Sequence, residues 1–482
     1  MQLDSPITLA FDRGTLLLAG GDAEFDFSTL PGVAYDNRTK THRAEGRCYR
    51  VIVEHLIREK LAYEDHARGW ETAPLALTLK SDREPFPHQK EAVDAWQKQG
   101  SRGCIILPTG TGKSFVAVMA IARTKRPTLI IVPTLDLMRQ WYNQLCDFFG
   151  IDVGLVGGSY FEFKPVTVTT YDSAYRHVER WGNQYGLVVF DEVHHLPGPT
   201  YQMAATAALA PFRLGLSATP DRADGAESFL PSLVGPIVYR KEIQELSGDY
   251  LAEYETRRVY VDLTIAEQAE YQKHRDIYRG FISSRGISLG GQNGWQRFII
   301  ECSRSDAGRE ALKAWREQKR IERAPASKYA KLDELLIRHA ADRTIVFTAD
   351  NATVHAISRK HLVPAITHQT KIKERKQILE RFDRGEYTVV VTSQVLNEGV
   401  DVPAAAVGIV LSGSGSTREN VQRLGRILRK HGDKQAILYE IIANNTSEVF
   451  TSDRRRQHGA FGEQSDSLPT SGAMPTALRG HV

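Results

Sequence analysis

Cysteine is scarce in this chain, with four among 482 residues, standing singly at Cys48, Cys104, Cys146 and Cys302. No two of them have the CxxC spacing, which argues against a zinc ribbon, an iron–sulfur cluster or a disulfide framework and fits a reducing compartment. Long apolar runs are also missing, since none approaches the roughly 18 residues that a membrane-spanning helix needs. The start MQLDSPITLAFD lacks a basic segment followed by an apolar core, so a signal peptide is not expected. These features favour a cytoplasmic protein.

A large excess of charge of either sign is missing as well. The chain has 62 basic and 58 acidic residues, a net charge of +4, so no strongly cationic nucleic-acid-binding tail is expected. A local basic groove remains compatible with that average. With 482 residues the chain is too long for one hydrophobic core, and two to four domains are expected.

Short apolar segments recur along the chain, each ending in a polar or glycine-rich turn, with amphipathic stretches between them. They lie at 104–108, 128–133, 166–170, 187–191 and 213–219, and again at 344–350, 387–393, 407–412 and 436–442. Continuous apolar strands that alternate with helices are typical of a parallel sheet covered on both faces. The sequence therefore predicts an α/β protein with two parallel-sheet domains, at about residues 84–245 and 326–445.

The remaining segments have a different composition. Residues 1–80 are expected to form a small α+β domain, and 446–482 a carboxyl-terminal extension with a loose tail from Phe461 onward. Residues 255–325 form a basic-leaning insert, in which 264–283 and 307–323 are predicted helices. The insert is either a solvated helical linker or a hairpin that grips nucleic acid. Trp295, beside Arg297 and Phe298, would then either pack a small helical core or stack against a base.

The segment CIILPTGTGKSFVAVMAIA (104–122) has the order strand, glycine-rich turn, helix. Gly110 and Gly112 would let the backbone approach phosphate oxygens, and the N–H groups of the turn and the helix N-terminus would form an anion nest. Lys113 would reach the β- and γ-phosphates and Ser114 would ligate Mg²⁺. A strict phosphate-loop pattern needs glycine at 107, where this chain has Leu107. The predicted nucleotide-binding residues of this segment are Pro108, Thr109, Gly110, Thr111, Gly112, Lys113 and Ser114.

The segment LVVFDEVHHLPG (187–198) ends an apolar strand in two carboxylates that are followed by two histidines. Alone, it could hold zinc, transfer protons or anchor Mg²⁺ beside a phosphate. Zinc would need three or four converging ligands, whereas the histidines are adjacent and no cysteine lies near. With the phosphate turn upstream, we expect Asp191 to hold Mg²⁺ and Glu192 to polarise the attacking water as general base. His194 is interpreted as a relay between nucleotide and motor, and His195 as structural.

The segment QRLGRILRK (422–430) predicts a helix with a polar face for the nucleotide. Gln422, Arg426 and Arg429 stand at i, i+4 and i+7 and so share one side of it. They can point together into a cleft and stabilise charge on a transferring γ-phosphoryl group, an effect worth roughly 10³–10⁵ in rate. Arg423 lies off that face and is expected to be structural. The catalytic arginines would then come from one domain, and Lys113 and the carboxylates from the other.

With these motifs in place, the chain resembles superfamily 2 helicases of the DExH type, whose motor consists of two tandem RecA-like lobes. The resemblance covers about 360 residues and implies ATP and Mg²⁺ as cofactors and DNA as partner. It implies that Gln89 reads the adenine, that Gly399 and Asp401 in VLNEGVDVPAA face the nucleotide, and that Ser217 and Thr219 couple hydrolysis to movement. Thr134, in PTLDLMRQW, and Thr169 and Thr170, in TTYDS, match segments that touch the nucleic-acid backbone.

Within that superfamily the chain is most similar to the XPB (xeroderma pigmentosum group B) helicases, in their archaeal and bacterial form. The region LPGVAYDNRTKTHRAEGRCYRVIVEHL resembles the group's small domain linked to damage recognition, and the insert lies where the group carries its thumb. TPDRADG resembles the group's Arg-Glu-Asp loop, with Arg222 and Asp224 retained and Ala223 in place of the glutamate. If that acid helps to separate strands, this chain translocates on duplex more readily than it unwinds.

The sequence as a whole predicts an ATP- and Mg²⁺-dependent DNA helicase or translocase, nucleoid-associated and acting in DNA repair. The 3′-to-5′ polarity and a nuclease or repair partner protein are implied by the resemblance, and the DNA would be single-stranded or duplex. Two alternatives stay open. One is the motor subunit of a restriction or defence system with its nuclease on a separate chain. The other is an ATP-gated clamp that holds duplex DNA and recruits a repair nuclease without unwinding.

Overall fold

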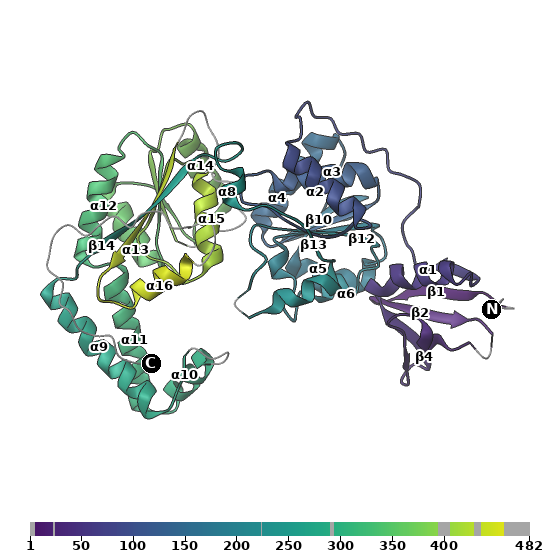
Figure 1. Cartoon of the computed structure of the whole chain (residues 1–482), viewed down its shortest axis with the longest axis horizontal. Coiled ribbons are helices and arrows are strands. Elements are labelled where there is room, and N and C mark those ends of the chain that lie inside the picture. Colours follow the sequence, from purple (N-terminus) through teal and green to yellow (C-terminus); the bar gives the residue numbers. More distant parts are fainter. Residues whose placement is uncertain are drawn as a thin grey trace. The chain divides into compact units, whose positions relative to one another are not determined.

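The computed structural model describes residues 5–22, 25–222, 224–289, 294–393, 405–428 and 435–456 (Figure 1). These residues divide into two compact units, the first ending at Glu245 and the second beginning at Leu246. The helix α8 (Ile243–Leu246) leads along the chain from one unit into the other. No helix of the described residues is both long and apolar enough to cross a membrane.

The first unit opens with a five-stranded sheet of order β3-β4-β2-β1-β5. Its elements are β1 (Ile7–Asp12), β2 (Thr15–Gly20), η1 (Phe27–Thr29), β3 (Ala34–Asp36), β4 (Thr41–Glu45), η2 (Gly46–Cys48), α1 (Tyr49–Arg58) and β5 (Tyr63–His66). Alternate residues of β1 and β2 are buried, and they pack with Ile52 and Leu56 of α1 into a core of this sheet's own. Gly14 and Gly46 lie against Ala207, so tightly that a Cβ atom at Gly14 would lie 2.6 Å from the Ala207 Cβ.

An eight-stranded sheet follows in the same unit, with the order β13-β6-β12-β11-β7-β10-β8-β9. Its strands are β6 (Arg102–Ile106), β7 (Thr128–Val132), β8 (Gly154–Gly157), β9 (Tyr160–Glu162), β10 (Val166–Thr170), β11 (Leu187–Asp191), β12 (Phe212–Ser217) and β13 (Ile237–Arg240). All pairs are parallel except β8 with β9. The accompanying helices are α2 (Pro87–Lys98), α3 (Lys113–Thr124), α4 (Leu135–Phe149), α5 (Tyr171–Trp181), η3 (Val193–His195), α6 (Met203–Thr206), η4 (Ala226–Phe229) and α7 (Leu230–Leu233). In Figure 1, α2 and α3 cover one face of this sheet, and α5 and α6 cover the other.

The second unit contains a six-stranded, fully parallel sheet of order β14-β19-β18-β15-β17-β16. Its strands are β14 (Tyr254–Val261), β15 (Thr344–Phe347), β16 (Ala365–Ile366), β17 (Val389–Thr392), β18 (Val407–Val410) and β19 (Ala436–Ala443). Its helices are α12 (Ala326–Arg338), α13 (Asn351–His361), α14 (Ile372–Asp383), α15 (Thr417–Ile427) and α16 (Glu448–Arg455). The predicted α/β class with two parallel-sheet lobes is confirmed, and β14, although it lies within 255–325, belongs to this sheet.

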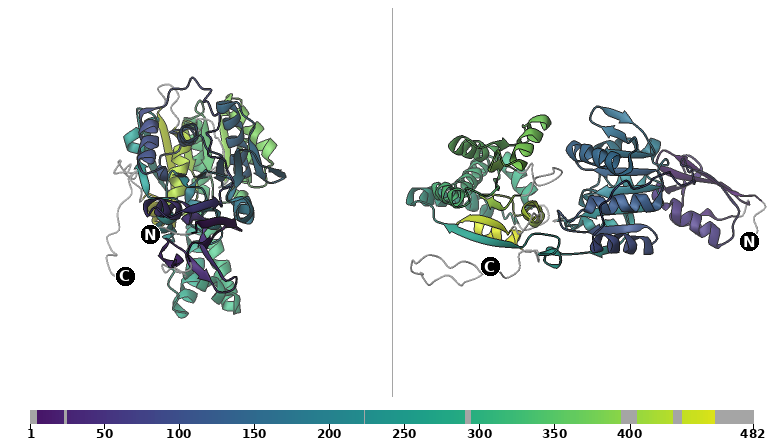
Figure 2. Two further views of the ribbon diagram at one scale, coloured as in Figure 1. Left: turned by 90° about the vertical axis from the view of Figure 1, so that its right-hand side faces the viewer. Right: turned by 90° about the horizontal axis from the view of Figure 1, so that it is seen from above.

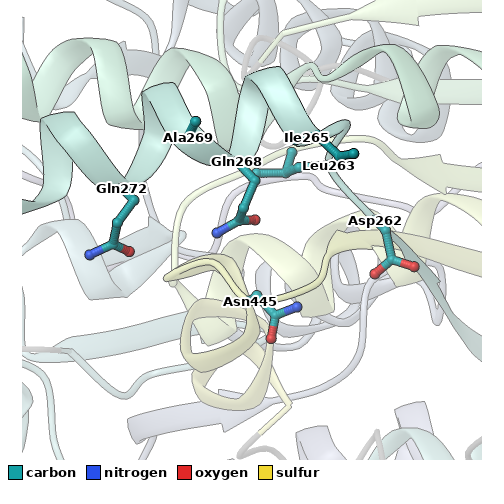
Figure 3. A pocket seen from close by; sticks show the side chains of 7 residues that line it. All are labelled: Asp262, Leu263, Ile265, Gln268, Ala269, Gln272 and Asn445. Carbon is teal, nitrogen blue, oxygen red and sulfur yellow. The ribbon is translucent and has the colours of Figure 1, made fainter. Parts of the chain in front are cut away.

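The helical insert begins at α9 (Ile265–Ser284) and continues with α10 (Gly294–Ser303) and α11 (Asp306–Arg323). Helices α9 and α11 lie side by side, and α10 lies at the end of the insert away from the sheet (Figures 1 and 2). Tyr271 on α9 accepts a hydrogen bond from the Ser447 N–H at 2.8 Å, which ties the base of the insert to the sheet. At this base, Gln268 and Gln272 extend from α9 on the same side as Asn445, around an open pocket of about 500 Å³ (Figure 3).

Candidate active site

The predicted catalytic motifs of the first unit meet at one edge of its eight-stranded sheet. The turn 107–112 follows β6, Thr134 follows β7, and Asp191, Thr170 and Ser217 each end a strand of the same parallel sheet. Because neighbouring parallel strands end at the same edge, residues far apart in the chain come together there.

The glycine-rich turn is shaped for close approach of an anion. Gly110 and Gly112 have φ angles of +91° and +83°, in the left-handed region that favours glycine. Gly112 is also the N-cap of α3 and offers no side chain to cap the helix. The first N–H groups of α3 are therefore not bound by a cap side chain, which suits a phosphate. Lys113 donates from Nζ to the Leu107 carbonyl at 3.1 Å and so lies over the turn.

Gln89 holds this turn from α2. Its Nε2 donates to the Thr111 carbonyl at 2.9 Å, and its Oε1 accepts from the Phe86 N–H at 3.0 Å. The side chain is completely buried. Both ends of the amide are thus used within the protein, and Gln89 fixes the shape of the phosphate turn. The contact with adenine that the resemblance implies stays a prediction.

Asp191 is buried and is oriented by two donors. Its Oδ2 accepts from Trp141 Nε1 at 2.8 Å, and its Oδ1 accepts from the Glu192 N–H at 3.0 Å. Burial raises the pKa of the Asp191 carboxyl, while the Trp141 hydrogen bond and the Lys113 charge act in the opposite direction. Trp141 lies at the end of the predicted nucleic-acid segment 133–141, so the sequence did not indicate that its indole supports the carboxylate.

Glu192, the predicted general base, has a left-handed backbone, with φ +46° and ψ +56°. Such a conformation costs a non-glycine residue about 1–3 kcal/mol and persists only where neighbouring contacts enforce it. The Tyr171 hydroxyl donates to the Asp191 carbonyl at 3.0 Å and holds the strand end from which this turn departs. The left-handed residue ends β11 and leads directly into η3, which carries His194.

His194 connects the carboxylate turn to the end of β12. Its Nδ1 lies 3.1 Å from Ser217 Oγ, and the Ser217 hydroxyl donates to the Thr219 carbonyl at 3.0 Å. With the hydroxyl proton directed at the Thr219 carbonyl, the tautomer of His194 that carries its proton on Nδ1 would complete this chain. The same Nδ1 lies 3.5 Å from Glu192 Oε2. His194, Ser217 and Thr219 therefore form one buried polar chain beside the predicted general base.

The loop that begins at Arg222 contacts the same turn. Arg222 binds Asp224 with two hydrogen bonds, from Nε at 2.8 Å and from Nη2 at 2.6 Å. Its remaining Nη1 donates to the His194 carbonyl at 2.5 Å. The paired guanidinium holds the pKa of the Asp224 carboxyl well below its usual range. Arg222 thus ties this loop to the main chain of the carboxylate turn, which spacing in the sequence did not reveal.

The three threonines assigned to nucleic-acid contact have local structural roles in this unit. Thr134 caps α4 by accepting from the Leu137 N–H at 3.2 Å, and Thr170 caps α5 by accepting from the Ser173 N–H at 3.2 Å. Thr169 is completely buried and donates to the Val156 carbonyl at 2.7 Å. Each threonine orders the start of a helix or a strand pair at the functional edge, and their contact with nucleic acid stays a prediction.

In the second unit, α15 carries the predicted arginine-finger motif. Gln422 is 2% exposed. Arg423 is completely buried, its guanidinium lies 5.5 Å from the Phe347 ring centroid, and burial lowers its pKa to about 10. The structure thus gives Arg423 the packing role that was expected. The side chain of Arg426, and Gly399, Asp401 and Arg429, lie outside the described residues.

Helix α16 holds the loop that leads into α15. Arg455 is 1% exposed and donates from Nε to the Ser414 carbonyl at 2.6 Å and from Nη2 to the Gly413 carbonyl at 2.9 Å. Its Nη1 donates to Glu440 Oε1 on β19 at 2.5 Å. The Thr417 hydroxyl, at the start of α15, donates to the Arg454 carbonyl at 3.0 Å. The position of the finger helix is therefore fixed by a buried contact that the sequence did not indicate.

Two oxygen donors near the sheet edge are of the kind that Mg²⁺ prefers. Among the described residues, no group of three or more His, Cys, Asp or Glu side chains is placed to hold a metal ion. One carboxylate, from Asp191, and one hydroxyl, from Ser114, match an ion that takes its other ligands from water and phosphate.

Three family models match this chain. One described as "XPB_DRD: Xeroderma pigmentosum group B helicase damage recognition domain" matches residues 9–67. The "Type III restriction enzyme, res subunit" model matches residues 82–222, and the "ERCC3/RAD25/XPB C-terminal helicase" model matches 313–460. Together these models match most of the chain, and two of the three describe one family.

Comparisons with individual proteins agree with the family models. The chain is 42% identical to the "DNA 3'-5' translocase XPB2" of Sulfurisphaera tokodaii, over 89% of this chain and 96% of that protein. It is 31% identical to the "DNA 3'-5' helicase XPB" of Kineococcus radiotolerans, over 81% of this chain and 66% of that protein. Among solved structures, the Hef helicase domain of Pyrococcus furiosus superposes with a TM-score of 0.51 at 20% identity, covering 77% of this chain and 98% of that one. This last similarity concerns the fold alone.

Proposed function

The chain belongs to the XPB family of helicases, and we propose on that basis that it is an ATP-dependent motor that moves 3′-to-5′ on DNA. The observation that carries this function is the buried polar chain from His194 through Ser217 to Thr219. It joins the turn that bears the predicted general base to the end of a neighbouring strand. A change at the γ-phosphate can therefore move the segment beyond Ser217.

In the proposed mechanism the residues of the first unit bind and orient ATP. The N–H groups of the turn 107–112 and the ammonium of Lys113 bind the phosphates, and Ser114 and Asp191 hold Mg²⁺. When bound, Mg²⁺ neutralises charge on the phosphate oxygens. Glu192 orients and polarises the attacking water. Arg426 and Arg429 of the second unit stabilise the transferring γ-phosphoryl group, with Gln422, Gly399 and Asp401 beside the nucleotide.

The N-terminal domain and the protein partners follow from the family. Residues 9–67 match a damage recognition model, which supports a role in DNA repair for the small first sheet. We infer that residues 1–80 recognise DNA structure, that the lobes at 84–245 and 326–445 form the motor, and that the insert contacts DNA. We propose a nuclease or another repair protein as the partner, and association with the nucleoid through DNA.

One feature favours movement on duplex DNA without unwinding as a second candidate function. Position 223 is alanine, where the group's loop has glutamate, while Arg222 is bound to Asp224 and to the His194 carbonyl. Because both remaining charged side chains, Arg222 and Asp224, form contacts within the first unit, the loop is less suited to separating DNA strands. The alternative of a restriction or defence motor has less support. The restriction-type model matches only residues 82–222, whereas the XPB models match segments toward both ends of the chain.

The test is ATP hydrolysis with no nucleic acid, single-stranded DNA, duplex DNA and RNA, with Glu192→Gln as the blank. We expect stimulation by DNA that is absent in Glu192→Gln. An unwinding assay on the same preparations separates a helicase from a duplex translocase. An identical rate in all four conditions would contradict a DNA motor.

A further inference from the structure

Helix α10, at the far end of the insert, carries an exposed tryptophan. All six tryptophans of the chain lie within the described residues, and Trp295 is 43% exposed. Trp70, Trp96, Trp141 and Trp181 are at most 8% exposed, and Trp315 is half-buried. Keeping such a large apolar side chain in water has a cost in free energy, which a binding partner that covers the indole would offset.

Trp295 is not needed for the core of the insert. That core consists of Tyr278, Phe281, Ile287, Phe298, Cys302, Ala311 and Ala314, with Trp315 packed against it. Trp295 lies outside this set, and its ring rests on Phe298 and Trp315 at centroid distances of 5.3 Å and 4.7 Å. These two contacts orient the indole while leaving much of it exposed. An aromatic ring oriented in advance loses little entropy when it binds.

The insert that carries Trp295 combines exposed apolar side chains with positive charge. Leu289, Ile299 and Ile300 are 39%, 38% and 51% exposed. Residues 264–323 contain twelve basic and eight acidic residues, a net charge of +4 that equals the net charge of the whole chain. Arg279 and Arg297 are exposed, and within the described part of the chain neither forms an ion pair with a carboxylate. Charge complementarity therefore favours a polyanion as the partner of this insert.

We propose that the end of the insert formed by α10 binds single-stranded DNA, with Trp295 stacking against an unpaired base. Arg297 lies two residues further along, on another side of the helix, and would bind the phosphate of a neighbouring nucleotide. Stacking needs a base whose π-face is accessible, which a single strand offers and an intact duplex does not. The proposal rests on the proposed function, because it assumes a chain that acts on DNA. It adds a contact outside the two lobes that distinguishes single strands from duplex.

The first experiment compares Trp295→Ala, Trp295→Phe and the wild-type chain in equilibrium binding to a fluorescein-labelled oligothymidylate and to a duplex of equal length. Replacing a stacking aromatic by alanine costs roughly 1–3 kcal/mol per base, which is about a 5- to 150-fold weaker Kd. We expect that loss for the single strand in Trp295→Ala, near wild-type binding in Trp295→Phe, and a duplex Kd within twofold of wild type. Ile337→Ala, which removes another exposed apolar side chain from the same unit, is the control and should bind both DNAs normally.

Two further readouts separate stacking from a structural effect. Intrinsic tryptophan fluorescence should be quenched by the oligothymidylate in the wild-type chain, and much less so in Trp295→Phe. Thermal unfolding of Trp295→Phe should match the wild type, because a ring remains against Phe298 and Trp315, and unchanged duplex binding by Trp295→Ala shows that its fold is kept. Arg297→Ala should reduce the slope of log Kd against log salt by about 0.7, whereas Trp295→Ala should leave that slope unchanged.

The inference and the proposed function fail in different ways. If DNA does not stimulate ATP hydrolysis by the wild-type chain, the proposed function is wrong, whatever Trp295 does. If DNA stimulates hydrolysis and Trp295→Ala binds the single strand as tightly as wild type, only the inference is wrong. Equal weakening for single strand and duplex in Trp295→Ala would also overturn stacking on an unpaired base.

Discussion

At Gly112 the backbone has φ +83°, and an added Cβ atom would lie 2.4 Å from Gln89 Nε2. Gly112→Ala would therefore strain the backbone and displace the amide that holds the Thr111 carbonyl. We expect ATP binding to weaken at least about tenfold, which corresponds to roughly 1.4 kcal/mol. The measurement is equilibrium binding of a fluorescent ATP analogue.

Gly385→Ala is the matched control for that prediction. Gly385 has a similar φ of +77°, but nothing lies within 4 Å of the Cβ position. The control carries the backbone strain without the clash at the phosphate turn and should bind the analogue normally. Equal affinity of the two variants would contradict the role given to Gln89 and Gly112.

Among the described residues of its loop, Arg222 contacts the carboxylate turn through a hydrogen bond to the His194 carbonyl. We expect Arg222→Ala to lower the DNA-stimulated kcat about tenfold, as the loss of a charge-assisted hydrogen bond worth roughly 1.5–3 kcal/mol allows. The KM for ATP should change less than twofold, because the phosphate turn is untouched. Arg222→Lys should recover part of the loss, and steady-state hydrolysis with saturating single-stranded DNA measures both. An increase in KM at constant kcat would argue against a positioning role.

The motif residues were predictable because their spacing is local, whereas the residues that support them were not. Lys113 and Asp191 follow apolar strands at fixed positions, so a short segment suffices to predict them. Trp141 meets Asp191 across 50 positions, and Arg222 meets His194 across 28. Such contacts depend on the order of strands in the sheet, which the sequence pattern does not specify.

Helix α16 is the element that positions the loop into α15. Arg455 and its partner Glu440 are 1% and 5% exposed, so Arg455→Ala leaves a buried carboxylate without its main partner. We expect the free energy of unfolding to fall by about 3–5 kcal/mol, measured by denaturant titration. DNA-stimulated kcat should fall as well, because α15 loses its support. Arg454→Ala, which changes an exposed neighbour on the same helix, should leave both quantities unchanged. Equal stability of the two variants would contradict the support that Arg455 gives to the loop before α15.

Elements with continuous apolar runs were predicted within about three residues, and so were the two charged helices α9 and α11, whereas β14 and α10 were missed. The segments at 166–170 and 187–191 coincide with β10 and β11, which are buried along their whole length. Strand β14 has the sequence YETRRVYV and lies at the edge of its sheet, where charged residues are tolerated. Helix α10 is only ten residues long and follows a glycine-rich segment, so periodicity gave it no signal.

For the whole molecule, the near-neutral charge makes DNA binding depend on local contacts. The net charge of +4 is small, and the helical insert alone accounts for a charge of that size. Each phosphate contact on a single strand adds about −0.7 to the slope of log K against log salt. With about five contacts, raising KCl from about 50 to 200 mM should raise the DNA concentration needed for half-maximal ATPase stimulation on the order of a hundredfold. The rate without DNA should stay constant over the same range, since the proposed nucleotide contacts do not involve the basic insert. A half-maximal DNA concentration that does not change with salt would mean that DNA is held by apolar contacts, and the basic insert would then lose its role in binding.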